Sequence, residues 1–187
     1  MGYALAEAAK NLDMGVSLIS GPVNLRCPQG VQLVRIETAL EMQEVMNAHF
    51  EKADLIIMCA AVSDHRPSKI YERKLRKNEF PDKIILKRNP DILKILGGRK
   101  KNQVLVGFAA ETNEIMISAK RKLKEKNLDW IVANDVSKSD IGFSSDKNEV
   151  TLISADGFLK QIPSTNKSKI AKEILDVIYP SCLKKVR

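Results

Sequence analysis

Along nearly the whole of this chain, short apolar runs alternate with segments whose apolar residues follow helical spacing. This alternation is typical of βαβ units, in which helices join parallel strands and cover the sheet. The expected strands are 16–19, 31–36, 54–59, 83–87, 104–108 and 130–133, followed by a hairpin of 150–153 and 158–162. The expected helices are 3–12, 39–52, 90–96, 113–126 and 165–178. We therefore predict an α/β fold, a Rossmann-like, doubly wound and mostly parallel sheet with a C-terminal β-hairpin.

Several element boundaries carry local signals. Thr38 and Glu41 form a capping box at the start of the second helix. Pro90 suits the first position of the third helix, which we expect to end at Gly97-Gly98. Thr112 or Asn113 can cap the fourth helix, and Asp156-Gly157 is a hairpin turn signal.

The length of 187 residues suits one hydrophobic core, so we interpret residues 1–187 as a single domain. The chain opens directly on a helix, whereas doubly wound folds normally begin with a strand and a glycine-rich turn. We expect that this first strand and loop are absent from the chain.

The formal net charge of +8 and the pI of about 9.4 favour an anionic ligand. Nucleic acid is the less favoured partner, because no basic-aromatic recognition motif is present. No apolar run approaches the roughly 18 residues of a membrane span, and the first residues lack a signal-peptide pattern. The three cysteines are widely spaced without a CxxC pair, so we expect a reducing cytoplasm, no disulfides and no zinc.

Asp64 is the first candidate site residue. It ends the segment Ala60-Ala61-Val62-Ser63-Asp64, just past the apolar run 53–59 that is expected to be a buried strand. Ligands of open α/β sheets bind at this edge, and a carboxylate there can hold Mg²⁺. The alternative is an ordinary loop or helix cap. We expect His65 to be a loop residue, because no second His or Cys stands at metal-binding spacing.

A basic cluster, Lys74-Leu75-Arg76-Lys77, begins ten residues beyond Asp64, within the charged segment 66–82. Weak periodicity and low apolar content predict a mobile basic flap there, whose cations would clamp a transferring phosphoryl or nucleotidyl group. The alternative is a solvated loop.

Two further junctions lead from a strand to a helix, at 87–93 and at 107–112. A helix N-terminus exposes free N–H groups that bind anions, although a plain cap by Asn89 also fits. Phe108 can pack on a flat base, although a Phe at a strand end is usually part of the core.

Lys122 and Lys126 are four residues apart and share one helix face. Such a pair suits a phosphate site, or simply a solvated surface.

Taken together, these segments resemble the phosphopantothenate–cysteine ligase half of the bacterial bifunctional phosphopantothenoylcysteine decarboxylase/ligase. The resemblance covers nearly the whole chain, and several motifs at fixed spacing are far more specific than any one. It rests on Leu18-Ile19-Ser20-Gly21-Pro22-Val23, Ala60-Ala61-Val62-Ser63-Asp64, Lys74-Leu75-Arg76-Lys77, Asn89-Pro90-Asp91-Ile92, Gly107-Phe108-Ala109-Ala110-Glu111-Thr112, Lys126-Asn127-Leu128-Asp129, Ala133-Asn134-Asp135-Val136 and Gly142-Phe143-Ser144-Ser145-Asp146.

The resemblance implies an enzyme of coenzyme A biosynthesis that uses CTP and Mg²⁺. The carboxylate of 4′-phosphopantothenate would attack the α-phosphate of CTP to give an acyl-cytidylate and pyrophosphate, and the amine of L-cysteine would then release CMP. Family members dimerise through this domain, so a homodimer is implied. In the full-length relatives the domain is fused to a flavin-dependent decarboxylase domain, and the resemblance implies neither a nucleic-acid nor a membrane partner.

The resemblance also implies roles for individual residues. Asp64 would contact the nucleotide and its metal, and Lys74 would be the catalytic lysine of the flap. The remaining nucleotide contacts would come from Met58, Cys59, Ala60, Pro90, Asp91, Ile92, Leu93, Phe108, Lys122 and Lys126.

The chain departs from the family pattern at two places. Arg76 replaces the middle lysine of the flap pattern Lys-x-Lys-Lys, which keeps the charge and changes the geometry. Of the family's N-terminal strand and Asn-containing Ser-Gly-Lys-Met-Gly loop, only Met1-Gly2 is present. Because that Asn handles the acyl-cytidylate, we expect this chain to bind CTP and to complete the ligation poorly or not at all.

Three alternatives remain open. A Rossmann-like module could bind a nucleotide without catalysis, which the missing loop favours and the retained Asp64 and Lys74 disfavour. A dinucleotide-dependent oxidoreductase is weakly supported, because no G-x-G-x-x-G follows a strand. A nucleic-acid binder would rest on the net charge alone and would lose affinity steeply with salt. The sequence does not decide between CTP and ATP.

Overall fold

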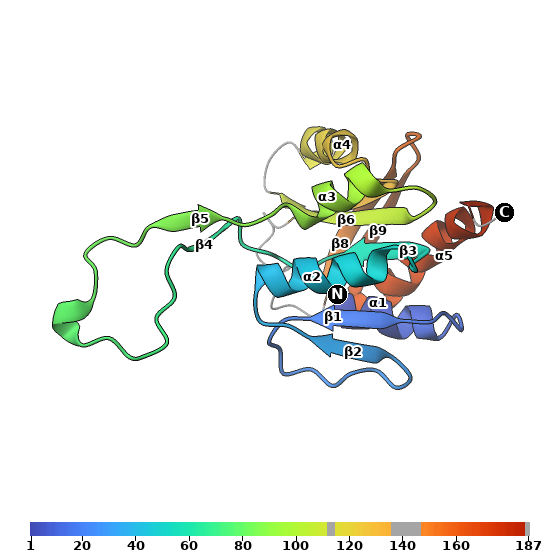
Figure 1. The fold of residues 1–187 in the computed structure, drawn as a ribbon. Helices are drawn as coiled ribbons and strands as arrows, with labels where there is room; N and C mark the ends of the chain where they lie inside the picture. The colour runs from blue at the N-terminus through green and yellow to red at the C-terminus, as the bar shows by residue number, and fades with distance from the viewer. Residues whose placement is uncertain (112–114, 136–146, 186–187) are drawn as a thin grey trace.

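The computed structural model describes residues 1–111, 115–135 and 147–185 (Figure 1). In these ranges the helices are α1 (Gly2–Lys10), α2 (Ala39–Phe50), α3 (Ile92–Arg99), α4 (Ile115–Glu125) and α5 (Lys167–Lys185), with a short 3₁₀ helix η1 (Lys77–Glu79). The strands are β1 (Ser17–Ser20), β2 (Gln32–Arg35), β3 (Leu55–Met58), β4 (His65–Pro67), β5 (Leu86–Arg88), β6 (Val104–Glu111), β7 (Trp130–Asp135), β8 (Lys147–Ser154) and β9 (Leu159–Asn166). The expected caps Thr112 and Asn113, Val136 and the motif 142–146 lie outside the described residues.

The central sheet has the strand order β3-β6-β7-β8-β9. β3, β6 and β7 are parallel, in a register that sets Met58 beside Gly107 and Gly107 beside Ile131. β8 and β9 are antiparallel and extend the sheet as the predicted C-terminal hairpin. The mixed α/β architecture with a mostly parallel sheet is therefore confirmed.

Helices cover both faces of this sheet (Figure 1). Val104 and Val106 of β6 pack in one buried cluster with Ile174 of α5. Leu105, between them, packs in the opposite cluster with Leu96 of α3. Because side chains alternate between the faces of a strand, a strand buried on both faces is apolar at every position. This double burial explains why β6 is a continuous apolar run in the sequence.

β1 and β2 form a separate parallel pair. Among the described residues, no strand pairs with the second edge of β1 or with the outer edge of β3. The first turn of α1 touches the carboxyl ends of both strands. Tyr3 Oη lies 3.0 Å from Ser20 Oγ, and a Cβ added to Gly2 would lie 3.1 Å from Cys59 Sγ. α1 therefore starts at the carboxyl edge of the sheet, between the ends of β1 and β3.

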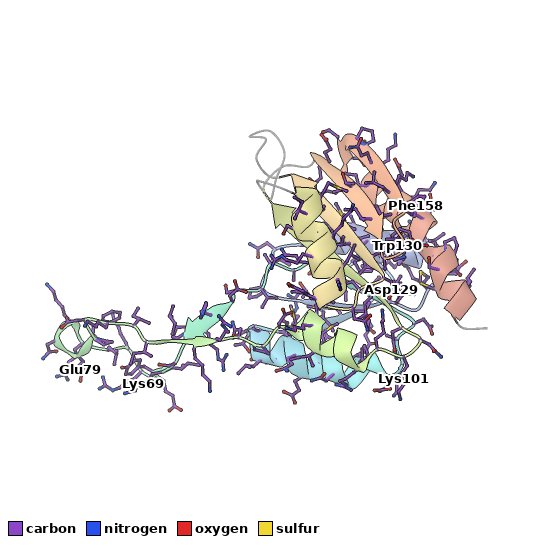
Figure 2. All side chains as sticks on the ribbon, turned by 90° about the horizontal axis from the view of Figure 1, so that it is seen from above. Lys69, Glu79, Lys101, Asp129, Trp130 and Phe158 are labelled. Atoms are coloured by element: carbon purple, nitrogen blue, oxygen red, sulfur yellow. The ribbon has the colours of Figure 1, made fainter. Side chains whose placement is uncertain are left out.

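Asp129 ties the parallel strands to the neighbouring turn. Its Oδ2 accepts hydrogen bonds from the backbone N of Leu105 at 2.8 Å and from Lys100 Nζ at 3.1 Å. Next to it, the rings of Trp130 and Phe158 meet edge to face, with centroids 5.8 Å apart (Figure 2). These contacts fix the end of the hairpin against the start of β7. Among the described residues, none of the helices combines the length and apolar character that a bilayer crossing requires.

Residues 65–88, named the arm below, leave the body as a long excursion that ends in η1 (Figure 1). At its base β4 and β5 are antiparallel, with Arg66 opposite Lys87. The expected strand 83–87 is shifted and shorter, because β5 can pair only with the three residues of β4. Ile84 and Ile85 are 60% and 73% exposed, so this apolar run is not part of the core.

The prediction for helix 90–96 was wrong at both ends. Asp91 is the N-cap, because its side chain accepts from the backbone N of Lys94, so Pro90 precedes the helix. The helix then continues through Gly97 and Gly98 instead of ending at them. A Cβ on Gly97 would lie 1.9 Å from the carbonyl oxygen of Lys126, so this glycine permits a close approach of α3 to the turn after α4.

The last helix is also longer than expected. Its start is set by Asn166, whose Oδ1 accepts from the backbone N of Lys169 at 2.8 Å. It continues past Pro180 to Lys185, because its apolar stripe continues at four-residue spacing. The buried members of that stripe are Ile170, Ile174, Ile178 and Cys182.

The two adjacent glycines of α3 give a matched test of this packing. Gly97→Ala should destabilise the domain by about 1–3 kcal/mol, because the added methyl group overlaps a backbone carbonyl. Gly98→Ala should stabilise it by about 0.5–1 kcal/mol, because nothing lies near its added Cβ and alanine favours a helix. Urea unfolding of both variants measures the difference, and equal effects would contradict the close approach.

Candidate functional site

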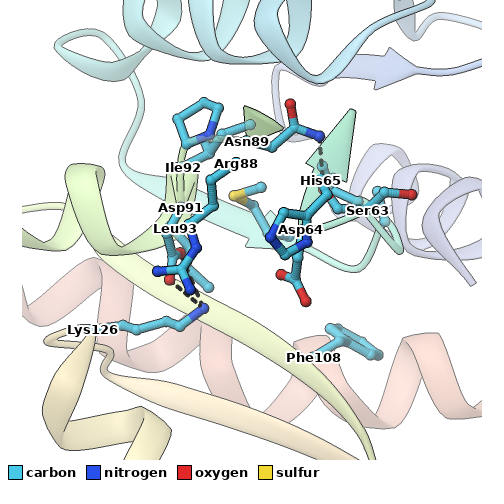
Figure 3. Close-up of a pocket in the computed structure, with 14 residues that line it drawn as sticks. Ser63, Asp64, His65, Arg88, Asn89, Asp91, Ile92, Leu93, Phe108 and Lys126 are labelled. Atoms are coloured by element: carbon cyan, nitrogen blue, oxygen red, sulfur yellow. Dashed lines mark hydrogen bonds and ion pairs between the residues drawn. The ribbon is translucent and has the colours of Figure 1, made fainter. Parts of the chain in front are cut away.

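A pocket of about 440 Å³ opens at the carboxyl ends of β3 and β6 (Figure 3). Its volume is within the range of small-molecule sites, about 300–1,000 Å³. The loop after β3, the junction from β5 to α3, the end of β6 and the turn after α4 contribute its walls. The lining residues are Met58, Ala60, Val62, Ser63, Asp64, His65, Arg88, Asn89, Pro90, Asp91, Ile92, Leu93, Phe108 and Lys126.

The walls combine apolar surface with charge. Phe108, on β6, is half-buried and lines the pocket, so part of its ring is available to stack on a planar group. Asp64 is exposed and lines the same pocket from the loop after β3. The pocket therefore offers a flat apolar group and a carboxylate in one opening.

Asp91 and Lys126 form an ion pair at the pocket wall. Lys126 Nζ lies 3.0 Å from each carboxylate oxygen of Asp91 (Figure 3). Asp91 Oδ1 also accepts from the backbone N of Lys94 at 3.1 Å, so it caps α3. The pair links the turn after α4 to the N-terminus of α3, where the Asp91 carboxylate lies at the positive end of the helix dipole and beside the lysine.

Nine of the twelve predicted binding residues lie together in the pocket lining. They are Met58, Ala60, Asp64, Pro90, Asp91, Ile92, Leu93, Phe108 and Lys126. The structure does not bring Cys59, Lys74 or Lys122 into the lining. Lys122 is half-buried one turn before Lys126, whose backbone N donates to the Lys122 carbonyl at 3.1 Å.

Cys59 is half-buried beside α1 rather than in the pocket wall. Burial raises the pKa of the Cys59 thiol. The thiol therefore stays protonated at neutral pH, and this cysteine is not an activated nucleophile.

Lys74 lies on the outer part of the arm, between Lys69 and Glu79, which Figure 2 shows far from the body. A clasp shapes this region. Arg73 Nη1 and Nη2 donate to the two oxygens of Glu79 at 2.8 and 3.0 Å, and the backbone N of Arg76 donates to Glu79 at 2.9 Å. Arg73, followed by the Arg76 amide, lowers the pKa of the Glu79 carboxyl, so the clasp is ionised at neutral pH.

Five lining residues were not among the predicted site residues: Val62, Ser63, His65, Arg88 and Asn89. The signal that could have found them is their position, since all five lie within six residues after the end of a predicted strand, 54–59 or 83–87. A plain helix cap by Asn89, the alternative for the junction 87–93, is wrong, because Asp91 caps α3. His65, interpreted as a loop residue, begins β4 and lines the pocket.

The two functions of Asp91 can be separated by substitution. Asp91→Asn keeps an N-cap acceptor and should change the free energy of unfolding little, because the pair with Lys126 is partly exposed. Asp91→Ala removes the cap and should cost about 1 kcal/mol. Urea unfolding without ligand measures both changes, and an equal loss in the two variants would show that the ion pair, not the cap, is the stabilising contact.

Comparison with known proteins gives a consistent set of relatives. A profile of the family described as "DNA/pantothenate metabolism flavoprotein C-terminal domain" matches residues 1–181. The chain is 45% identical over 179 residues to the coenzyme A biosynthesis bifunctional protein CoaBC of Bacillus subtilis. The matched region covers 95% of this chain and 44% of that protein. It is 40% identical over 182 residues to CoaBC of Escherichia coli K12, and this match covers 95% of the chain and 45% of CoaBC. The chain therefore spans less than half the length of the curated relatives it matches.

Solved structures agree with this result. The crystal structure of the C-terminal domain of CoaBC superposes with a TM-score of 0.80 at 40% identity, covering 96% of this chain and 82% of that one. A mutant of Cab2 in complex with phosphopantothenate-cysteine has a TM-score of 0.63 at 19% identity, covering 84% of this chain and 55% of that one. At that identity the likeness shows a shared fold alone.

Proposed function

Because the chain belongs to the family of DNA/pantothenate metabolism flavoprotein C-terminal domains, we propose that it is the phosphopantothenate–cysteine ligase part of a coenzyme A biosynthesis protein. The carboxylate of 4′-phosphopantothenate attacks the α-phosphate of CTP, which forms an acyl-cytidylate and releases pyrophosphate. The amine of L-cysteine then attacks the activated carbonyl carbon, loses a proton and releases CMP. The product is 4′-phosphopantothenoylcysteine.

The observation that carries this proposal is the convergence of three kinds of group in one pocket. Phe108 offers a face for the base, Lys126 would exchange its contact with Asp91 for one with phosphate, and Asp64 offers a carboxylate. A nucleoside triphosphate bound with Mg²⁺ needs all three kinds of group. The chain supplies them from segments far apart in sequence, so the convergence is a property of the fold.

The residues present fit a magnesium ion that the nucleotide helps to bind. Among the described residues, no group of three or more His, Cys, Asp or Glu side chains is placed to hold a metal. Mg²⁺ commonly uses one or two carboxylates together with substrate phosphates, and Asp64 at the pocket supplies one. When bound, Mg²⁺ would neutralise charge on the polyphosphate.

Lys74 is proposed as the catalytic lysine, and this role requires the arm to bring it to a pocket. Its charge would then neutralise the charge that develops on the phosphates as pyrophosphate leaves. The clasp between Arg73 and Glu79 holds the segment around Lys74 in a defined shape before it arrives. Closure therefore needs movement of the arm as a whole rather than folding of its tip.

The proposal extends to partners and location. A homodimer would cover apolar side chains that the arm exposes, among them Ile70 at 82%, Phe80 at 63% and Ile85 at 73%. The curated relatives are described as bifunctional and are more than twice as long as the matched region, which supports fusion to a flavin-dependent decarboxylase domain. A biosynthetic ligase that consumes CTP would work in the cytoplasm.

A nucleotide-binding module without catalysis is the second candidate. Its support is that Lys74 does not line the pocket. A measurement of turnover, rather than of nucleotide binding, distinguishes the ligase from the non-catalytic module.

The first experiment is calorimetric binding and thermal unfolding with CTP, ATP, UTP and GTP, each with Mg²⁺. CTP should bind most tightly, and at one hundred times its Kd it should stabilise the fold by about 2.7 kcal/mol. Lys126→Gln should weaken CTP binding about tenfold by removing a phosphate-attracting charge. Lys124→Gln, an exposed lysine of α4, is the matched control and should bind normally. Equal responses to all four nucleotides would contradict CTP selectivity.

Substitution of the arm lysine tests the catalytic proposal. Lys74→Gln should leave the free energy of unfolding unchanged, because the residue is exposed on the arm and away from the core. In any form that turns over 4′-phosphopantothenate, CTP and cysteine, turnover should fall by about 10²-fold or more. Lys83→Gln, an exposed lysine of the same arm, should retain turnover. Unchanged turnover in Lys74→Gln would contradict its catalytic role.

A further inference from the structure

One side chain joins the arm to the pocket. Asn89 Oδ1 accepts from Arg66 Nη1 at 2.8 Å, and its Nδ2 donates to the carbonyl oxygen of Ser63 at 2.8 Å. Its backbone N donates to the carbonyl oxygen of Asp64 at 2.7 Å. Asn89 therefore contacts β4 of the arm and the loop that carries Asp64, and it lies two residues before the N-cap of α3.

Hydrogen bonds also fix the base of the arm at this junction. Arg66 is half-buried, and its Nη1 also donates to the carbonyl oxygen of Arg88 at 2.8 Å. The backbone N of Ser68 donates to the carbonyl oxygen of Ile85 at 2.8 Å. One guanidinium therefore clamps β4 to β5 and both to Asn89, and a hydrogen bond to a charged donor is stronger than a neutral one.

We propose that Asn89 is a positioning residue that couples the arm to the nucleotide pocket, so that a nucleotide held at Asp64 and Asp91 biases the direction of the arm. This inference rests on the proposed function, in which the arm delivers Lys74. Any shift of the Asp64 loop changes the carbonyls that Asn89 contacts. The same shift reaches Arg66 through the amide oxygen of Asn89.

The chemistry of this position selects asparagine. The contact with Ser63 needs a donor and the contact with Arg66 needs an acceptor, and a carboxamide supplies one of each. In Asn89→Asp an oxygen would face the Ser63 carbonyl, so that contact becomes repulsive while the contact with Arg66 remains. Arg66→Ala does the reverse, since it removes the arm contact and leaves the pocket contact.

The test compares these variants in the full chain. Trypsin cleavage within the arm reports its position, because the arm is rich in lysine and arginine. In the native chain, CTP with Mg²⁺ should slow this cleavage. Arg66→Ala should keep CTP affinity within about threefold and lose the protection. In any form that turns over, it should lower kcat about tenfold with little change in KM. Asn89→Asp should lose the protection and also weaken CTP binding, whereas Arg66→Lys should restore part of the protection.

The matched control is Asn47→Asp. Asn47 Oδ1 accepts from Arg99 Nη1 at 2.8 Å, which is the same type of contact on α2, away from the pocket lining. This variant should keep native protection and native kcat. The coupling is contradicted if Arg66→Ala also keeps native protection and native kcat. It is also contradicted if all variants lose protection only in proportion to their loss of CTP binding.

Hydrogen exchange without nucleotide separates this inference from the proposed function. In Asn89→Ala the amides at the arm base and in the loop 60–64 should both exchange faster, and in Asn47→Ala neither should. If CTP does not bind the native chain but this joint change occurs, the proposed function fails, while the link that Asn89 makes between the arm and the loop 60–64 stands. If the loop exchanges at the native rate in Asn89→Ala, the coupling fails whatever CTP does.

Discussion

The close approach of α3 and the turn after α4 to the central sheet is the constraint on which the pocket depends. On β6, a Cβ added to Gly107 would lie 2.9 Å from a Leu128 methyl group and 3.0 Å from a Leu93 methyl group. The contact of Gly97 with the Lys126 carbonyl is closer still. These approaches bring Lys126 within 3.0 Å of the Asp91 carboxylate at the pocket wall. The parallel register of β3 and β6 then brings the Asp64 loop to the same edge.

Much of this fold can be predicted from the sequence, because it depends on which residues are buried. β6 is apolar at each of its first positions since both of its faces are covered, and α2 begins at Thr38, whose side chain accepts from the backbone N of Glu41. The end of α3 could not be predicted in the same way. In a sequence, a pair of glycines that ends a helix looks the same as a pair that lets another segment approach closely. Only the close approach of Gly97 to Lys126 in the structure distinguishes the two cases. That contact joins residues 29 positions apart in the sequence.

The pocket was predictable where it follows from strand ends. Asp64 and Phe108 lie at the carboxyl edge because every parallel strand delivers its following residues there. Asn89 could not be interpreted correctly, because its partner Arg66 comes from a strand pairing of only three residues across the base of an arm. Weak periodicity gives no sign of that pairing. Lys74 does lie on the arm, where the charged segment 66–82 predicts a flap, but the sequence does not show that it lies outside the pocket lining.

The arrangement of arm and pocket would suit the proposed ligase activity for a physical reason. A catalytic lysine fixed in the pocket beside Lys126 would also hold the pyrophosphate product and slow its release, whereas cations on an arm act only while the arm is closed. The cost of closure then depends on how much must be ordered. The tip is already shaped by Arg73 and Glu79, whose carboxyl pKa is lowered by that contact, so little ordering remains there. In that proposal the base, held by Arg66 and Asn89, would decide the free energy of closure.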